Sequence, residues 1–234
     1  MKHTLLIKDW LSSFLSLLFP RCCVVCGRPL AKGEECICTV CNINLPRTNY
    51  HLRKDNPVER LFWGQIPLER ATSFFFYEKG SDFRLILHRL KYGGQKEIGA
   101  IMGRYMAAEL LSSNFFQGID VIIPIPLHKK KQQIRGYNQS EWIARGIAAV
   151  TGIPIDTESI LRKKNTETQT RKSVFERRDN VEGIFELQHP ETLAGKLILI
   201  VDDVLTTGST TLACASCIVN VEGIRISILT LATA

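Results

Sequence analysis

The stretch Leu197-Ile-Leu-Ile-Val-Asp-Asp-Val-Leu-Thr-Thr-Gly-Ser-Thr-Thr211 determines how the rest of the chain is interpreted. Its apolar start is typical of a strand buried on both faces of a parallel sheet. The turn that follows is rich in Thr, Gly and Ser and opens a helix, whose positive end offers backbone N–H and hydroxyl donors to a phosphate. Gly208 allows a positive φ and a close approach of the ligand to the backbone. Asp202 and Asp203 would repel a phosphate unless they face the hydroxyl groups of a sugar, so the stretch predicts a ribose-phosphate site.

Sequence on both sides of this stretch alternates between strand and helix patterns. Continuous apolar runs indicate strands, and apolar residues at i, i+3, i+4 and i+7 indicate helices. Asn138-x-x-Glu141 has the form of a capping box at the start of one helix. The alternation predicts an α/β domain with a parallel sheet. Strands are expected over 71–77, 120–125, 184–187, 197–201 and 226–231, and helices over 83–90, 98–112, 138–150 and 210–220.

The bulk composition fits a globular protein with an anionic partner. The 234 residues are 45% hydrophobic and 23% charged, which argues against a disordered chain. The net charge of +7 favours a negatively charged partner. A polyphosphorylated small molecule, nucleic acid and an anionic membrane surface all satisfy it, so charge alone does not choose among them.

Six of the eight cysteines fall between positions 22 and 41. Cys23 and Cys26, like Cys38 and Cys41, have the C-x-x-C spacing that lets two thiolates point at one ion. Two such knuckles supply the tetrahedral four-sulfur shell that zinc prefers. A shell closed by four thiolates leaves no open coordination position, so the sequence predicts a structural zinc and not a catalytic one.

The cysteine pattern also has other interpretations. Cys22 could replace Cys23, and Cys36 lies close to the second pair. A disulfide scaffold or a set of free thiols would use clustered cysteines as well, although disulfides are rare in cytosolic proteins. Cys214 and Cys217 repeat the spacing among small apolar residues on a predicted helix, so we expect them to be buried and not to bind metal.

The amino-terminal stretch 4–20 is apolar but lacks the features of a signal sequence. Ser12, Ser13 and Ser16 interrupt a segment that is too short to span a bilayer, and no small-x-small cleavage site follows it. Apolar residues at i, i+4, i+7 and i+8 from Trp10 predict an amphipathic helix, which would dock on the body of the protein or on a membrane surface. We therefore expect a cytoplasmic protein without integral membrane association.

The stretch around Asp202 resembles the signature with which type I phosphoribosyltransferases bind 5-phosphoribosyl-1-pyrophosphate (PRPP). The resemblance implies that Asp202 and Asp203 contact the 2- and 3-hydroxyls of the ribose and serve in catalysis. It also implies that the 5-phosphate is held by Thr206, Thr207, Gly208, Ser209 and Thr210.

Further motifs are Ile123-Pro-Ile-Pro-Leu127, Arg135-Gly-Tyr-Asn-Gln139, Gln169 and Arg177-x-x-Asn180-Val181. They extend the resemblance over essentially the whole chain. Together with the cysteine head, they are similar to the ComF family. The resemblance implies a phosphoribosyltransferase-like domain over 59–234, behind an amino-terminal helix, zinc ribbon and linker over 1–58. It also implies a link with natural competence, the uptake of single-stranded DNA.

The basic segment 129–135, expected as a loop, lies where phosphoribosyltransferases place their pyrophosphate loop. A diphosphate leaving group needs positive charge and backbone amides. Arg135, Gly136 and Asn138 are the expected pyrophosphate ligands. A solvated basic loop without a ligand is the alternative.

The polar stretch 163–180 would be a flexible hood that closes over bound PRPP. Closure excludes water, which would otherwise hydrolyse the reactive ribosyl group. The expected hood residues are Gln169, Arg177 and Asn180. An ordinary linker is the alternative for a loop of this length.

The resemblance leaves open the acceptor and whether catalysis takes place. In a transferase, a nucleophile would displace pyrophosphate at C1 of the ribose, with Mg²⁺ bridging the diphosphate and the sugar hydroxyls. A PRPP sensor that performs no chemistry would use the same binding residues. A third hypothesis is an accessory protein of DNA uptake that binds single-stranded DNA or a helicase partner. A homodimer is a further alternative that the sequence leaves open.

Overall fold

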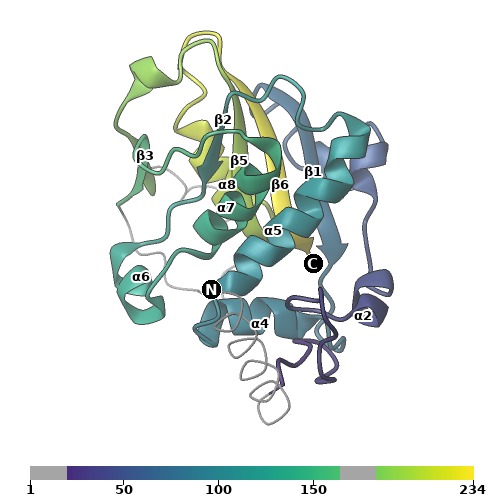
Figure 1. Ribbon diagram of the computed structural model, residues 1–234. Coiled ribbons are helices and arrows are strands. Elements are labelled where there is room, and N and C mark those ends of the chain that lie inside the picture. Colours follow the sequence, from purple (N-terminus) through teal and green to yellow (C-terminus); the bar gives the residue numbers. More distant parts are fainter. Residues whose placement is uncertain (1–19, 164–182) are drawn as a thin grey trace, which may run out of the picture.

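A four-stranded parallel sheet forms the centre of the molecule. The computed structural model describes residues 20–163 and 183–234, and Figure 1 shows the strands side by side among the helices. The strand order is β1 (Leu68–Phe76), β6 (Arg225–Thr233), β5 (Leu197–Leu205) and β2 (Val121–Pro124). All neighbouring strands run parallel. Their carboxyl ends therefore meet at one edge of the sheet, where ligands bind in open α/β sheets.

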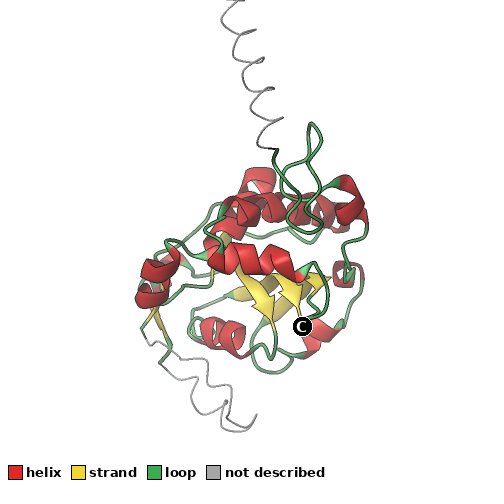
Figure 2. Cartoon of the chain, turned by 90° about the horizontal axis from the view of Figure 1, so that it is seen from below, coloured by secondary structure: helices red, strands yellow, loops and turns green. Residues whose placement is uncertain are grey.

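The strand β5 is buried on both faces because its side chains alternate between two apolar layers. Leu199 and Val201 belong to the layer that contains the helices α5 (Glu97–Leu110) and α7 (Gln139–Thr151). Ile198 and Ile200 belong to the opposite layer, with α8 (Ser209–Ser216). Figure 2 shows helices on both sides of the strands. This position in the sheet requires a continuous apolar run, as the sequence predicts.

Two glycines allow α5 and α7 to pack in direct backbone contact. A side-chain carbon on Gly103 would lie 2.3 Å from the carbonyl oxygen of Ile143, and one on Gly146 would lie 2.1 Å from that of Ala100. Neither position accepts a side chain larger than hydrogen. The contact holds α7 against the sheet with its amino-terminal end at the carboxyl edge, because α7 follows the end of β2 in the chain.

The cysteine head packs on the same layer of helices. Cys36 Sγ lies 3.8 Å from Met102 Sδ of α5, and Glu35 forms an ion pair with Arg104 of the same helix. The buried cysteines of the head share one apolar core with α5, α7 and the sheet. The head is therefore held on α5 by both packing and charge.

The other elements are short or lie at the periphery. The helix α4 (Arg84–Tyr92) lies beneath the carboxyl ends of the strands in Figure 1. β3 (Ile160–Arg162) and β4 (Phe185–Leu187) form an antiparallel pair. The helices α2 (Thr39–Ile43), α3 (Pro57–Arg60) and α6 (Lys129–Arg135) and the 3-10 turns η1 (Tyr50–Leu52), η2 (Leu111–Ser113) and η3 (Pro190–Thr192) complete the list of elements in the described chain.

The predicted α/β class, with its parallel sheet and flanking helices, is confirmed, but several short segments differ from expectation. The helices α2 and α3 were not predicted, and the expected strand over 184–187 pairs with β3 outside the parallel sheet. The basic segment 129–135 is the helix α6 and not a loop. The His128 side chain caps it by accepting a hydrogen bond from the Lys130 backbone N–H, and Gly136 ends it with a φ of 80°. The lysines and glutamines between these ends favour a helix. β3 was not predicted, because a strand of three residues is too short to show a period.

The predicted cap of α7 is confirmed in part. The Asn138 side chain accepts a hydrogen bond from the Ser140 backbone N–H. Glu141 pairs instead with Arg145, at 2.7 Å. Asn138 therefore caps the helix while Glu141 stabilises the exposed side of its first turns.

Some predictions concern residues that the structure does not describe. Residues 4–19 of the expected amphipathic helix lie outside the described ranges, as do the expected hood residues Gln169, Arg177 and Asn180. In the two ranges that are described, no helix combines the length and apolar character needed to cross a membrane.

Gly146→Ala tests the close packing of α5 on α7. The added methyl group would collide with the backbone carbonyl of Ala100, so we expect the free energy of unfolding to fall by roughly 2 to 4 kcal/mol in urea denaturation. Gly80→Ala is the control, because no atom lies within 4 Å of the added carbon. It should lower the free energy of unfolding by less than about 0.5 kcal/mol. Equal stability of the two variants would contradict the close contact.

Candidate functional site

The predicted phosphate loop forms the turn between β5 and α8. Gly208 adopts a φ of +74° and directly precedes the first helical residue, Ser209. The Thr207 hydroxyl lies 2.8 Å from the Ser209 hydroxyl, and Thr206 and Thr210 are exposed. The loop therefore presents small hydroxyl side chains at the positive end of a helix, at the carboxyl edge of the sheet.

Phe62 supports this loop from within the core. Its side chain is fully buried, and a side-chain carbon on Gly208 would lie 3.3 Å from its ring. Any other residue at position 208 would have both an unfavourable φ and this close contact. The sequence predicts the glycine but gives no signal for Phe62, because the two residues are far apart in the chain.

Two donors hold the carboxylate of Asp202. The Ser140 hydroxyl donates to its Oδ1 at 2.9 Å, and the Asp203 backbone N–H donates to the same oxygen at 2.8 Å. Burial and then the negative charge of Asp203 raise the pKa of Asp202 to about 7, although both hydrogen bonds and Lys91 oppose the rise. The group therefore changes charge near neutral pH, as groups in ligand sites often do.

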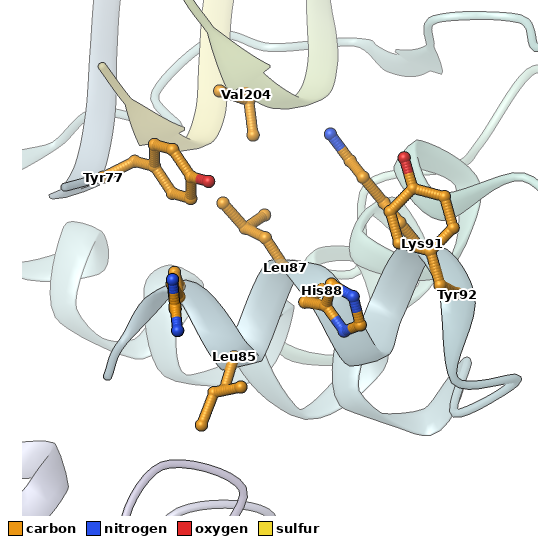
Figure 3. A pocket seen from close by; sticks show the side chains of 8 residues that line it. Tyr77, Leu85, Leu87, His88, Lys91, Tyr92 and Val204 are labelled. Carbon is orange, nitrogen blue, oxygen red and sulfur yellow. The ribbon is translucent and has the colours of Figure 1, made fainter. Parts of the chain in front are cut away.

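Lys91 neutralises the second carboxylate. Its Nζ lies 3.0 Å from Asp203 Oδ1, and the two side chains are only 24% and 14% exposed. Figure 3 shows Lys91 rising from α4 toward the end of β5. A pair shielded to this extent is screened less by salt than a surface pair. The sequence gives no role to Lys91, because the pairing depends on how α4 packs under the sheet.

Four cationic side chains gather beside the two carboxylates. Burial lowers the pKa of Lys131, and the positive charges of Arg162, Arg135 and Lys91 lower it further. Burial also lowers the pKa of Arg162, which Asp202 partly restores. Cations that repel one another at a partly buried site are typical of a place that receives a polyanion, because a bound diphosphate would offset the repulsion. We call Lys91, Lys131, Arg135 and Arg162 the cation cluster.

The expected pyrophosphate ligands have different environments. Arg135 belongs to the cation cluster, and its guanidinium lies 5.4 Å from the centre of the Tyr92 ring. Gly136 makes the turn between α6 and α7. Asn138 is buried, and its amide donates to the Ile125 carbonyl at 3.0 Å. Asn138 thus joins the end of β2 to α7, and its contact with pyrophosphate stays a prediction.

The expected hood would begin and end beside these residues. β3 and β4 pair the described residues on either side of the segment 164–182, with Arg162 opposite Phe185. Lys163 and Glu186 add an ion pair at 2.5 Å. Because Arg162 belongs to the cation cluster, the described residues that flank the expected hood lie at the site.

The four predicted zinc ligands form one cluster. The Sγ atoms of Cys23, Cys26, Cys38 and Cys41 all lie within 4.8 Å of one another. Cys26 Sγ and Cys38 Sγ are 3.7 Å apart, close to the edge of roughly 3.8 Å in a tetrahedron with zinc–sulfur bonds of about 2.3 Å. The backbone N–H groups of Cys38 and Cys41 donate to the Sγ atoms of Cys23 and Cys38 at 3.3 and 3.5 Å. The donor set therefore fits a structural zinc ion.

The structure distinguishes these ligands from the neighbouring cysteines. Cys22 is exposed and lies outside the cluster. Cys36 faces Met102 in the core, and burial raises its pKa to about 12. Burial would also raise the pKa of Cys23, but hydrogen bonds from the backbone at Cys26, Cys38 and Val25 outweigh it and lower the pKa to about 6. A thiol that ionises below neutral pH is suited to bind a metal.

The remaining cysteines support the structural interpretation. All eight cysteines are free, so none of them forms a disulfide. Cys214 is fully buried in the apolar layer of α8, as predicted. Cys217 is half-buried, and its Sγ donates to the Cys214 carbonyl at 3.0 Å.

Comparison with known proteins places the chain among relatives named for DNA use and competence. It is 32% identical over 209 residues to the DNA utilization protein YhgH of Escherichia coli O157:H7, over 83% of this chain and 88% of that protein. It is 31% identical over 130 residues to competence protein F of Haemophilus influenzae, over 54% of this chain and 57% of that protein. Competence protein ComFC of Bacillus subtilis is 25% identical over 214 residues, 89% of this chain and 82% of that protein. No family model matches the chain.

Two solved structures are also similar to the chain. Adenine phosphoribosyltransferase from Leishmania tarentolae has a TM-score of 0.38 and 12% identity, over 81% of this chain and 94% of that one. Glutamine PRPP amidotransferase from B. subtilis has a TM-score of 0.35 and 20% identity, over 58% of this chain and 26% of that one.

The raised pKa of Asp202 predicts a pH-dependent stability. The folded chain holds this proton up to about pH 7, whereas an unfolded Asp loses it near pH 4, roughly. The stability that Asp202 costs therefore grows as the pH rises between these two values, and it stays constant at higher pH. Asp202→Asn removes this cost, and its Oδ1 can still accept both hydrogen bonds. We expect the free energy of unfolding to rise by roughly 2 kcal/mol at about pH 8 and to change little near pH 4.

Urea denaturation of both proteins at the two pH values measures this difference. Asp55→Asn is the control, because Asp55 is exposed and its positive φ suits Asn equally well. Its effect on stability should be the same at both pH values. A gain in Asp202→Asn that does not depend on pH would contradict the raised pKa.

The purified protein should carry one tightly held zinc ion. Cys26→Ser removes one of four thiolates, so zinc content should fall to near zero and the free energy of unfolding by roughly 2 kcal/mol or more. Cys22→Ser is the matched control and should keep the metal, because Cys22 lies outside the cluster. Metal analysis of protein prepared under reducing conditions without chelators provides the measurement. Wild-type protein without zinc would refute the assignment.

Proposed function

This chain belongs to the ComF family, and from that premise we propose that it binds Mg²⁺-PRPP at the carboxyl edge of its sheet and transfers the phosphoribosyl group to an acceptor. The supporting observation is the arrangement of charge at the end of β5, where Asp202 and Asp203 lie beside the cation cluster. A phosphate loop follows directly in the chain. PRPP carries the hydroxyl groups of its ribose between a monophosphate and a diphosphate. These three parts match the phosphate loop, the two carboxylates and the cation cluster.

Each part of PRPP would contact a different part of the site. The 5-phosphate would accept hydrogen bonds from the backbone and hydroxyl groups of residues 206–210. The 2- and 3-hydroxyls of the ribose would donate to Asp202 and Asp203. The diphosphate would lie against Lys131, Arg135 and Arg162, which would offset the repulsion among these cations.

The reaction would be a displacement at C1 of the ribose. The bond from C1 to the diphosphate oxygen breaks, pyrophosphate leaves with the electron pair, and the acceptor atom bonds to C1. Positive charge develops on the ribose, where ionised Asp202 and Asp203 would stabilise it, and the cation cluster would stabilise the departing pyrophosphate. Mg²⁺ accompanies PRPP and supplies further positive charge at the diphosphate. The hood over 163–180 would exclude water from the ribose.

A second candidate is a PRPP-sensing accessory protein of DNA uptake that performs no transfer. It is supported by the relatives named DNA utilization protein and competence protein. The net charge of +7 would favour contact with single-stranded DNA or with a helicase that carries it. Such a protein would act in the cytoplasm, where the zinc thiolates stay reduced. DNA affinity that falls steeply with salt would support this candidate.

Asp202→Ala combined with Asp203→Ala tests the PRPP site. Loss of both carboxylates should weaken Mg²⁺-PRPP binding by roughly 100-fold or more, because each hydrogen bond to a charged group contributes about 1.5 to 3 kcal/mol. Isothermal titration measures the affinity. A pyrophosphate-release assay with a panel of bases, amines and single-stranded DNA measures transfer in the same samples.

Glu191→Ala combined with Glu222→Ala is the matched control. It removes two exposed carboxylates from the segments that lead into β5 and β6, so PRPP affinity should not change. Unchanged affinity in a folded Asp202 and Asp203 double variant would refute the site. Release of pyrophosphate that depends on an acceptor would establish a transferase, and binding without release would favour the sensor.

A further inference from the structure

A pocket of about 630 Å³ lies between α4 and the carboxyl ends of β1 and β5. Tyr77, which follows β1, and Val204 of β5 line it from the sheet, and Leu87 and Lys91 line it from α4. Figure 3 shows the Tyr77 ring and the Leu87 side chain pointing toward each other in the space beneath Val204. Pockets of this volume hold small organic ligands.

The pocket adjoins the proposed ribose site. Lys91 lines the pocket and also lies 3.0 Å from the carboxylate of Asp203. Val204 is the next residue in β5 after Asp203. At the other end, Tyr92 lines the pocket and lies under the guanidinium of Arg135. A ligand in the pocket would therefore lie beside the ribose that Asp202 and Asp203 hold.

The Tyr77 end of the pocket and α6 lie on opposite sides of β5, whereas the Tyr92 end of the pocket reaches Arg135 of α6. The strand order β1-β6-β5-β2 puts β5 between them. Lys131 and Arg135 lie on α6, which follows β2, whereas Tyr77 follows β1 at the other edge. The diphosphate would then point toward β2, and the Tyr77 end of the pocket would face the other side of C1. Displacement requires the attacking atom opposite the leaving group, so the Tyr77 end of the pocket lies on the side from which an acceptor would approach.

The lining residues favour a flat and negatively charged ligand. Tyr77, His88 and Tyr92 supply aromatic rings, and the His88 and Tyr92 rings are 5.3 Å apart. Arg84 supplies positive charge, the charge of Lys91 is shared with Asp203 just outside the lining, and the described lining itself includes no acidic residue. Rings stack on planar ligands, and a guanidinium binds a carboxylate with two parallel hydrogen bonds.

We propose that this pocket is the acceptor site and that the acceptor is a heteroaromatic ring bearing a carboxylate. This inference rests on the proposed transferase function. A ring nitrogen would attack C1 as the bond to the diphosphate oxygen breaks, and pyrophosphate leaves with the electron pair. A proton on that nitrogen would pass to water. Arg84 would bind the carboxylate, while Tyr77 and Leu87 hold the ring against the end of β5.

The test uses two pairs of probes that differ in one negative charge, orotate against uracil and nicotinate against nicotinamide. With Mg²⁺ and PRPP, the full chain should release pyrophosphate with at least one of the acids, with a kcat/KM about 10-fold or more above that of its uncharged counterpart. Arg84→Gln should lower this value by about 10-fold and keep PRPP affinity within about 2-fold. Arg89→Gln changes the same helix outside the pocket and should alter neither quantity.

Ligand-observed NMR with the four probes and without PRPP separates this inference from the proposed function. If PRPP does not bind but an acid does, and Arg84→Gln weakens it, the transferase is refuted while carboxylate recognition by the pocket is supported. Equal response to charged and uncharged probes would overturn the inference. No response to any probe in either assay, or no effect of Arg84→Gln, would overturn it as well.

Discussion

Two adjacent carboxylates at the end of β5 are the constraint on which the arrangement of the site depends. Burial and mutual repulsion raise the pKa of Asp202 to about 7, so the pair costs stability unless other groups compensate. Ser140 of α7 and Lys91 of α4 supply the first partners. Both helices belong to the layer that covers one face of the sheet. The apolar packing of that layer therefore fixes the groups that make the charged pair tolerable.

Features of the site that are local in the chain can be predicted from the sequence. The strand, the two carboxylates and the phosphate loop occupy fifteen consecutive residues, 197–211, and each has a recognisable pattern. Phe62 contacts this stretch from the turn after α3, Lys91 from α4 and Ser140 from α7. Such contacts depend on how helices pack on the sheet, and a single sequence carries no pattern for them. The same holds for the pocket, whose walls come from three separate elements.

Errors in the prediction of the fold concern short segments. The seven residues of α6 contain three lysines, and this basic run is typical of an exposed loop. Their helix depends on its ends, where His128 accepts a hydrogen bond from Lys130 and Gly136 adopts a left-handed conformation. The helix has a consequence for charge. Lys131 and Arg135 are four residues apart, so a helix puts them on one face, and both join the cation cluster.

The cysteine head and the site are connected through one packed layer. Cys36 of the head contacts Met102 of α5, α5 meets α7 through Gly103 and Gly146, and α7 carries the Ser140 hydroxyl that holds Asp202. Four thiolates would close the shell of a zinc ion, so the metal would supply no open position for chemistry. Loosening of the head would reach Asp202 through packing. Weaker PRPP binding in a zinc-free protein would therefore indicate a displaced Ser140 and not a catalytic metal.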